Sequence, residues 1–379
     1  MKDPSTYDVA IIGGGLAGLC LSIQLADAGH SVVLFEKEVY PFHKVCGEYI
    51  SLESWDFLER LGVPLSSWIL PVIKKFQVSD VKGQLYNFNL PLGGFGISRY
   101  KLDAALYQLA LAKRVQVFTG TKVTDTRFAD KSFVIDSAAG NFTATAVAGS
   151  FGKRSNLDLK WNRLFTQQKA SKLNNYMGIK YHIRYPHPPD TIALHNFHNG
   201  YCGISKIEDD RYCLCYLTTA QNLKQSGYSI AQMEASLLQQ NPRLKEIFSN
   251  AEFLYQEPLA ISQISFDKKM QVEDHVLMIG DAAGMITPLC GNGMSMAMHG
   301  SKIAFEQIHL FLQQQISRTQ MEAAYTNQWK KQFSKRLWMG RNVQRTFGGN
   351  TSSSLFFKTM KAIPPLARLV IRSTHGEPF

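Results

Sequence analysis

Residues 8–36, DVAIIGGGLAGLCLSIQLADAGHSVVLFE, decide the fold of the N-terminal part of the chain. Two apolar runs flank an apolar-periodic stretch, which predicts a strand, a glycine turn, a helix and a second strand. In the spacing G-x-G-x-x-G, Gly13 permits the tight turn, Gly15 lets the backbone approach a pyrophosphate, and Gly18 lets the helix pack close to the strand. Glu36 ends the second strand, where a carboxylate accepts a ribose hydroxyl. This context predicts a dinucleotide site; the alternative is a glycine-rich turn with Glu36 in solvent.

The composition narrows the class of protein. The chain has 379 residues, more than one hydrophobic core usually fills, so we expect two domains. The net charge of +11 favours contact with anions such as nucleotide phosphates, nicotinamide cofactors or an acidic membrane surface. Nucleic acid is not an expected partner, because the sequence has no basic run of five residues, no aromatic RNA-binding signature and no zinc-finger spacing.

The cysteines and the start of the chain bear on its compartment. Six cysteines are scattered without C-x-x-C pairs, so we expect neither disulfides nor a zinc site, and a reducing environment. The polar start Met1-Lys2-Asp3-Pro4 runs directly into the first strand and leaves no room for a signal peptide. No stretch approaches the roughly 20 apolar residues that a spanning helix needs. We therefore expect a cytoplasmic protein.

Local patterns predict the other elements. The first half reads as a helix that Ser51 caps and Gly62 ends, a hairpin over 74–88, a helix from 98, and strands at 115–118, 122–128, 132–135 and 142–148. Strands at 176–185, 191–197, 201–207 and 211–218, with one helix over 229–240, predict an antiparallel sheet outside the nucleotide core. An apolar strand and glycine turn at 276–284 precede a long helix over 291–312, which predicts a second cradle, and the last sixty residues are expected to be helical.

Three motifs resemble those of the FAD-dependent oxidoreductases of the p-hydroxybenzoate hydroxylase fold, in the branch of the geranylgeranyl-reductase-like proteins and flavin monooxygenases. They are Gly13–Gly18 with Glu36, the helix start Arg99-Tyr100-Lys101-Leu102-Asp103, and Gly280-Asp281-Ala282-Ala283-Gly284 with Pro288, and they span nearly the whole chain. The resemblance implies that the first cradle binds the ADP half of FAD and that Asp281 binds the ribityl chain. It also places the helix that begins at Gly291–Met294 at the pyrimidine edge of the isoalloxazine, where a helix N-terminus favours the anionic reduced flavin.

The resemblance also implies a set of FAD contacts and a domain plan. The expected contacts are Gly13, Gly15, Leu16, Ala17, Gly18, Glu36, Lys37, Cys46, Gly47, Arg99, Val123, Gly280, Asp281, Ala282, Pro288, Gly291, Asn292, Gly293 and Met294. The expected fold class is α/β, with a Rossmann-like FAD-binding domain, an antiparallel β-sheet substrate domain and a helical C-terminal region. The FAD-binding domain is discontinuous, over 1–70, 98–158 and 265–318, the substrate domain covers 71–97 and 159–264, and the C-terminal region covers 319–379.

The stretch Val45-Cys46-Gly47-Glu48 resembles the cysteine-glycine stretch of geranylgeranyl reductases, where the cysteine faces the flavin. This resemblance suggests Cys46 as a candidate catalytic residue beside the isoalloxazine. The alternative is a small buried filler, as free cysteines usually are. Sequence does not decide between them, since thiolate reactivity requires a lowered pKa.

Two departures from the family pattern affect the expected chemistry. Phe151 stands where many flavin hydroxylases carry an aspartate that helps to seat pyrophosphate and nicotinamide cofactor, which puts NADPH docking in doubt. Lys153 and Arg154 are alternative phosphate partners, or else two solvated basic residues. The segment 200–205, GYCGIS, lacks the tryptophans of the corresponding strand in reductases and halogenases, and Lys74 and Lys75 are expected to face water. Both observations argue against a halogenase.

A metal site is not expected, although His182, His187, His195 and His198 suggest one at first sight. His195 and His198 lie in an expected strand, where residues i and i+3 point to opposite faces, whereas metal ligands must converge.

The expected activity is FAD-dependent monooxygenation of a lipophilic aromatic or polyketide-type substrate, with NADPH or NADH as electron donor. Two alternatives stay open: geranylgeranyl-reductase-like reduction of isoprenoid double bonds, which the Cys46 stretch favours, and a non-enzymatic dinucleotide-binding redox sensor. The C-terminal aromatic residues, interleaved with Lys and Arg, predict either helical core or a peripheral membrane contact. The sequence names neither the substrate nor the oligomeric state.

Overall fold

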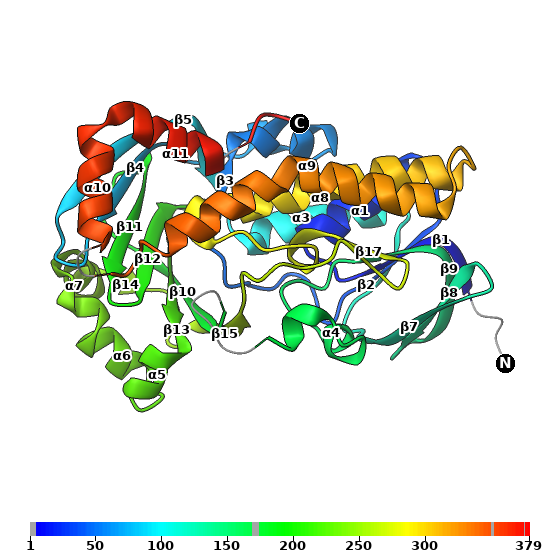
Figure 1. Cartoon of the computed structure of the whole chain (residues 1–379), viewed down its shortest axis with the longest axis horizontal. Helices are drawn as coiled ribbons and strands as arrows, with labels where there is room; N and C mark the ends of the chain where they lie inside the picture. Colours follow the sequence, from blue (N-terminus) through cyan, green and yellow to red (C-terminus); the bar gives the residue numbers. More distant parts are fainter. Residues whose placement is uncertain (1–4, 169–173, 350–351, 375) are drawn as a thin grey trace.

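The computed structural model describes residues 5–168, 174–349, 352–374 and 376–379. Two β-sheets lie one beyond the other along the long axis of the molecule, with helices around both (Figure 1). The predicted α/β fold class is confirmed. The domain boundaries given above stay predictions, and the sheets are described below by the strands that form them.

The first sheet has eight strands and contains the N-terminal cradle. Its order is β16-β17-β9-β1-β2-β6, and β8 pairs with both β7 and β9. The pairs that β1 forms with β2 and β9 are parallel, as are β2 with β6 and β9 with β17. The strands are β1 (Ser5–Ile12), β2 (Val32–Phe35), β6 (Gln116–Phe118), β7 (Val123–Ala129), β8 (Ser132–Ser137), β9 (Gly140–Gly149), β16 (Val272–Glu273) and β17 (Val276–Met278).

Helix α1 (Leu16–Asp27) packs unusually close to β1, and two glycines make this possible. Gly13 has a φ of +108°, which an L side chain rarely adopts. A Cβ on Gly18 would overlap the carbonyl oxygen of Gly13. The roles that the glycine spacing predicts for these two residues, a tight turn and a close helix approach, are therefore seen in the structure.

The second sheet has nine strands, in the order β14-β10-β13-β12-β11-β4-β5-β3, and β15 pairs with β10. Its pairs are antiparallel, as predicted, except that β4 and β11 run parallel. The β4–β5 hairpin comes from a separate stretch of chain, so no short turn fixes its direction against β11. The strands are β3 (Tyr49–Ser51), β4 (Val72–Ser79), β5 (Leu85–Gly96), β10 (Tyr176–Arg184), β11 (Thr191–Phe197), β12 (Gly200–Lys206), β13 (Tyr212–Thr219), β14 (Glu252–Phe253) and β15 (Leu259–Ile264).

Two local predictions for this region are wrong. The single helix expected over 229–240 is instead α6 (Ile230–Ser236) followed by a 3-10 turn at Leu238–Gln240. Asn241 then caps a further helix, α7 (Pro242–Asn250), which has Pro242 in its first turn. The strand expected over 191–197 is confirmed as β11 (Thr191–Phe197), but His198, expected in the same strand as His195, lies in the turn that follows. The other α-helices before α8 are α2 (Trp55–Arg60), α3 (Arg99–Ala112), α4 (Asn156–Lys160), α5 (Ala220–Gln225), α6 (Ile230–Ser236) and α7 (Pro242–Asn250).

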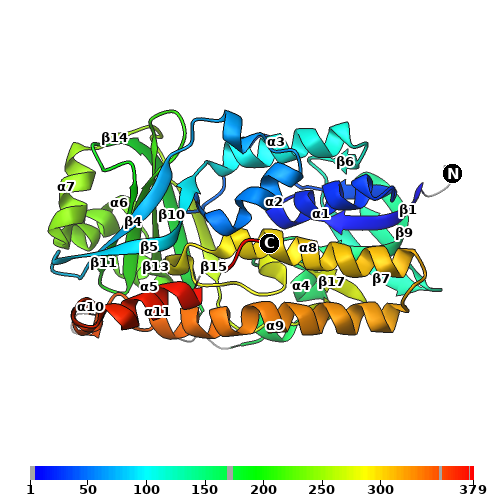
Figure 2. The ribbon, with the colours of Figure 1, turned by 90° about the horizontal axis from the view of Figure 1, so that it is seen from above.

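The long helix expected over 291–312 and the helices expected in the last sixty residues are present, as α8 (Gly293–Leu312), α9 (Arg318–Gln344), α10 (Ser352–Ala362) and α11 (Pro364–Thr374). Helix α8 packs between α1 and α9, and α11 packs against both α9 and α10. Figure 2 shows α9, α10 and α11 along one edge of the molecule. Within the described ranges, no helix is long and apolar enough to cross a membrane.

A buried arginine ties the helix α4 to the second glycine turn and the loop before β16. Arg163 is 2% exposed and donates to the carboxylate of Asp158 at 2.7 Å. It also donates to the carbonyl oxygens of Met270 at 2.9 Å and Ala282 at 3.2 Å. Removing the guanidinium would therefore leave a buried carboxylate without its partner.

We expect Arg163→Ala to lower the free energy of unfolding by about 3 kcal/mol or more, because an unpaired buried charge is costly. The control is Lys160→Ala, which removes a half-exposed lysine from Asp125 and should cost less than about 1 kcal/mol. Urea unfolding followed by circular dichroism measures both. Equally small losses of unfolding free energy in Arg163→Ala and Lys160→Ala would contradict the stabilising role given to Arg163.

Candidate active site

The first cradle lies at the turn between β1 and α1. Gly15 is the N-cap of α1, and no described side chain caps this helix, so its first N–H groups are free to bind a ligand. The Glu36 carboxylate is 6% exposed and accepts from the backbone N–H of Gly14 at 2.8 Å and of Glu38 at 3.0 Å. These bonds place the carboxylate beside the turn, where the sequence analysis expects a ribose hydroxyl.

The space in front of this helix fits a pyrophosphate. A Cβ built on Gly15 would meet one described atom within 4 Å, the Nζ of Lys44 at 3.8 Å. The backbone N–H groups and a lysine ammonium thus face the same open volume, and both favour negative charge. The residues present therefore fit the pyrophosphate of the dinucleotide that the family implies.

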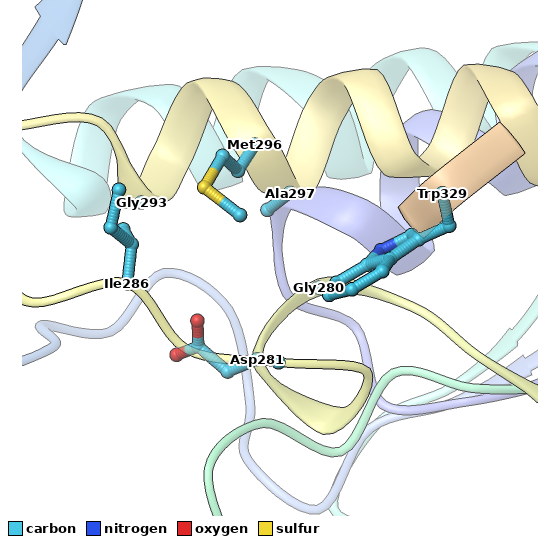
Figure 3. Close-up of a pocket in the computed structure, with 8 residues that line it drawn as sticks. Gly280, Asp281, Ile286, Gly293, Met296, Ala297 and Trp329 are labelled. Atoms are coloured by element: carbon cyan, nitrogen blue, oxygen red, sulfur yellow. The ribbon is translucent and has the colours of Figure 1, made fainter. Parts of the chain in front are cut away.

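The second cradle lies where β17 enters the turn Gly280–Gly284 and continues to α8. An opening lies between this turn and α8, lined by Gly280, Asp281, Gly284, Ile286, Gly293, Met296, Ala297 and Trp329 (Figure 3). The Asp281 carboxylate points away from Trp329, towards the side that Ile286 and Gly293 line (Figure 3). Burial raises the pKa of Asp281, while Lys269, Arg99 and Lys153 lower it.

The two cradles are adjacent in space. Gly280 has a φ of +60°, and a Cβ on it would lie 3.2 Å from the Cβ of Ala17 in α1. The first turn of α1 and the second glycine turn therefore line one continuous site, although about 260 residues of sequence separate them. Burial, Arg154 and Lys37 lower the pKa of the Lys153 ammonium, while Asp281 raises it.

Two basic residues that the sequence analysis did not select support the second cradle from behind. The Lys269 ammonium donates to the carbonyl oxygens of Asp281 at 2.8 Å and Lys153 at 2.7 Å. Its burial lowers the pKa to about 8. Arg163 holds the next carbonyl, of Ala282, as described above. No local sequence signal marks these residues, because both act on carbonyl groups that are distant in sequence.

Arg99 begins α3, where the sequence analysis places it. Its guanidinium forms a bidentate pair with Asp103, at 2.8 and 2.7 Å, and Lys44 approaches the same carboxylate at 3.2 Å. Asp103 is 1% exposed, and the two cations hold its pKa below its usual value despite burial. The expected contact Val123 lies at the start of β7, next to the loop in which Thr121 N–H donates to the Glu36 carbonyl at 2.8 Å.

Cys46 lies between the second cradle and the second sheet. Its Sγ is 3.6 Å from the Sδ of Met294 in the first turn of α8, and its carbonyl accepts from the Cys213 thiol at 3.1 Å. Burial raises the pKa of the Cys46 thiol, although Arg99 opposes the shift. The structure therefore places this thiol at the end of the helix expected to face the isoalloxazine, and in its neutral form.

Glu48 is the centre of a buried polar cluster that the sequence analysis missed. Its Oε1 accepts from Lys180 Nζ at 2.5 Å and from the Arg99 backbone N–H at 2.8 Å. Its Oε2 lies 2.6 Å from His182 Nε2, and His182 Nδ1 lies 2.6 Å from the Tyr255 hydroxyl. Glu48 is fully buried with a φ of 55°, a backbone conformation that costs a non-glycine residue roughly 1–2 kcal/mol.

The cluster holds the segment before Glu48 against the second sheet. Lys180 Nζ also donates to the Lys44 carbonyl at 3.1 Å, and the Ser205 hydroxyl donates to the Gly47 carbonyl at 3.1 Å. The Cys213 thiol on β13 donates to the Cys46 carbonyl, as described above. Side chains of β10, β12 and β13 thus fix Lys44, Gly47 and Cys46, respectively. The positions of Cys46 and Gly47 at the cradle follow from these bonds.

The histidines do not gather into one metal site. His195 is buried and bonds Ser79 at 3.0 Å, and His187 bonds the Thr191 carbonyl, whereas His182 bonds Glu48. The three side chains therefore belong to different hydrogen-bond networks. Ligand atoms of Glu48, His182 and Cys213 do lie within 4.8 Å of one another. However, the Lys180 ammonium is already bonded to Glu48, and its positive charge opposes a metal cation at that place.

We expect Gly15→Val and Glu36→Ala to yield colourless apoprotein, because the first fills the space before the helix and the second removes the ribose acceptor. Flavin absorbance of the purified proteins measures this. Glu38→Ala is the matched control, since it removes an exposed neighbouring carboxylate and should keep the flavin. Full flavin content in both test variants would overturn the assignment of the first cradle.

We expect Glu48→Gln to lower the free energy of unfolding by about 3 kcal/mol near neutral pH, since it leaves the buried Lys180 ammonium unpaired. The cluster also makes a pH prediction. Hydrogen bonds and charge from His182 and Lys180 lower the Glu48 pKa below its ordinary 4.5, against the effect of burial. Its stabilising contribution is complete above the unfolded-state pKa of 4.5 and is lost as the pH falls through the lower folded-state pKa.

Urea unfolding at about pH 7 and at about pH 4 measures how much the free energy of unfolding falls in acid. This fall should be smaller in Glu48→Gln than in the unaltered protein, because the variant lacks the carboxylate that titrates. Glu252→Gln on the neighbouring β14 is the control, since it changes an exposed pair with Arg184. An unaltered acid-dependent loss in Glu48→Gln would refute the role given to this carboxylate.

Comparison with known proteins agrees with this geometry. Residues 8–43 match a family model described as an FAD binding domain. An uncharacterized protein of Methanocaldococcus jannaschii is 30% identical over 94% of this chain and 89% of its own length. The kynurenine 3-monooxygenase of Flavobacterium psychrophilum is 23% identical over 86% of this chain and 75% of its own length.

Solved structures show the same fold. A flavin-dependent brominase superposes with a TM-score of 0.79 at 19% identity, covering 98% of this chain and 93% of its own. A geranylgeranyl bacteriochlorophyll reductase-like protein from Thermoplasma acidophilum superposes with a TM-score of 0.74 at 16% identity, covering 98% and 92%. At these identities the likeness is one of fold, so the argument against a halogenase stays a prediction. The chain belongs to the FAD-dependent oxidoreductases of the p-hydroxybenzoate hydroxylase fold, in the branch that includes flavin monooxygenases and geranylgeranyl-reductase-like proteins.

Proposed function

We propose that this FAD-dependent oxidoreductase is a monooxygenase that hydroxylates a lipophilic aromatic or polyketide-type substrate, with NADPH or NADH as electron donor. The observation that carries the proposal is an aromatic cluster beside the second cradle. Buried aromatic side chains of the second sheet meet those of the C-terminal helices here; they include Tyr86, Tyr176, Tyr201, Phe266 and Phe357.

This aromatic cluster adjoins the part of the site assigned to the isoalloxazine. Met285 and Leu289, from the loop that leads into α8, pack against it. Phe347 contacts both Tyr201 and Phe357 with ring centroids 5.6 and 5.3 Å apart. An apolar, aromatic wall next to a polar cofactor cradle is the usual composition of a site for a drug-sized lipophilic ligand.

The roles of the chain's own groups follow from their positions. Bound FAD would supply the redox chemistry, held by the first cradle through Gly15 and Glu36 and by the second through Asp281. The N-terminus of α8 carries partial positive charge and would stabilise negative charge on a flavin bound beside it. The aromatic cluster and α10 keep water from the side where the substrate is expected, and exclusion of water protects a reactive intermediate.

Cys46 has a positioning role in this proposal. Its neutral thiol contacts Met294 and lies among uncharged sulfur groups of Cys213 and Met294, so it forms part of the wall beside the cofactor. A neutral thiol is a poor nucleophile, since the thiolate is the reactive species. The cysteine is therefore expected to influence substrate fit more than the chemical step.

The second candidate function is reduction of isoprenoid double bonds, as in geranylgeranyl reductases. The resemblance of Val45-Cys46-Gly47-Glu48 to the reductase stretch favours it, and the 3.6 Å distance between Cys46 Sγ and Met294 Sδ, in the first turn of α8, supports it. Both reactions use the same cofactor site and an apolar substrate wall. They differ in whether oxygen is consumed and in the product that forms.

The test mixes flavin-loaded protein with NADPH and either an alkylated phenol or geranylgeranyl diphosphate, and follows oxygen consumption and product mass together. Monooxygenation predicts that the phenol accelerates oxygen use and gains one oxygen atom. Hydrogenation of the isoprenoid without oxygen use would overturn it in favour of the reductase. Cys46→Ala, compared with Cys20→Ala in α1, should change turnover less than about tenfold if the thiol only positions the substrate.

A further inference from the structure

Positive charge is concentrated at the C-terminal end of the chain. Residues 323–376 contain ten lysines and arginines and no aspartate or glutamate. This segment therefore carries +10 of the net charge of +11, which leaves +1 for the other 325 residues. A field of this kind attracts an anionic partner to one part of the molecule.

The helices of this segment also expose large apolar side chains. Leu355 is 69% exposed, Leu369 62%, Trp338 59% and Ile363 48%. They lie on α10, on α11, on α9 and in the turn between α10 and α11. Single exposed apolar residues are ordinary, but four within one basic segment indicate a surface that meets something apolar as well as anionic.

The apolar and basic side chains alternate along the same helix faces. In α11, Arg368, Leu369 and Arg372 are exposed, whereas Ala367 and Ile371 are buried. This is helical spacing, so the three exposed residues form one stripe and the two buried ones lie opposite. We call the exposed sides of α10, α11 and α9 beyond Lys330 the C-terminal basic face.

The same pattern holds in the other two helices. In α10, Leu355 and Lys358 are exposed at i and i+3, opposite buried Phe357 and Met360. In α9, the exposed stripe runs through Lys331, Lys335 and Trp338. Among the described residues of these helices, one basic side chain is in an ion pair, the buried Arg336 with Glu53. The exposed cations of the face are thus available to an external anion.

The three helices lie together on one side of the molecule. α11 packs against α9 and α10, and Figure 2 shows the three along one edge of the molecule. Their inner faces reach the substrate side, since Phe357 of α10 is part of the aromatic cluster and the Thr374 carbonyl of α11 accepts from Asn292 at 2.7 Å. The C-terminal basic face therefore covers the aromatic cluster from outside.

We propose that the C-terminal basic face docks on the surface of an anionic lipid bilayer. Cations attract the headgroups, while Trp338 and the exposed leucines enter the interface between headgroups and acyl chains. Leucine and isoleucine among the cations favour lipid over nucleic acid, because these side chains provide neither stacking on bases nor hydrogen bonds to them. Docking there would bring the aromatic cluster close to a source of lipophilic compounds.

The experiment is sedimentation of the full chain with vesicles of phosphatidylcholine alone, or with about one third phosphatidylglycerol, at about 0.1 M salt. The unaltered protein should bind the anionic vesicles and not the zwitterionic ones. Replacing Lys358, Lys361, Arg368 and Arg372 with Glu should weaken binding roughly a hundredfold or more. Leu355→Ser with Leu369→Ser should weaken the binding that persists at high salt.

The matched control replaces Lys82, Lys122, Lys224 and Lys245 with Glu, which changes the total charge equally at exposed lysines outside the described ion pairs of the chain. It should bind vesicles like the unaltered protein. Circular dichroism and flavin absorbance verify that each variant is folded. Equal loss in test and control variants, absence of binding to anionic vesicles, or binding to RNA in place of vesicles would each overturn the proposal. None of these readouts depends on turnover, so they are independent of the proposed reaction.

Discussion

The buried carboxylate of Glu48 joins the two halves of the molecule, and the geometry of the flavin site depends on it. Its partners come from α3, through the Arg99 backbone, and from β10 of the second sheet, through Lys180 and His182. In a low-dielectric interior each of these buried polar groups raises the free energy of the folded state when it lacks its partners. The folded state is therefore stable only when the whole cluster is formed. The segment that carries Cys46 and Gly47 is fixed as a consequence.

The flavin site itself combines close backbone packing with positive charge. Glycines bring α1 and the second glycine turn together and leave the space in front of Gly15 open, with Lys44 Nζ as the one described atom within 4 Å of a Cβ built there. Lys44, Arg99, Lys153 and Lys269 surround this space, and the carboxylates of buried Asp103 and half-buried Asp281 balance part of their charge. Such a site favours an anionic dinucleotide before any specific contact forms, and its fixed dipoles need no rearrangement on binding.

The C-terminal helices contribute side chains both to the aromatic cluster beside the site and to the outer surface of the molecule. Their inner faces complete an aromatic cluster that the second sheet alone would leave exposed, and their outer faces carry most of the net charge. The two faces serve different physical needs, since one excludes water from the substrate side and the other requires water or lipid headgroups around its cations. An amphipathic helix satisfies both, which explains why this region contains aromatic and basic residues in alternation.

The sequence alone determined what depends on local backbone geometry and on patterns with a fixed period. The cradle at Gly13–Gly18, most strands of both sheets and the helical C-terminus follow from glycine spacing, alternation and helical periodicity. Only the tertiary structure decided which distant residues meet: the parallel pairing of β4 with β11, the support that Arg163 and Lys269 give to the second cradle, and the cluster around Glu48. Those contacts join residues up to 134 positions apart, and the interactions of buried charges depend on burial and partners that no local pattern records.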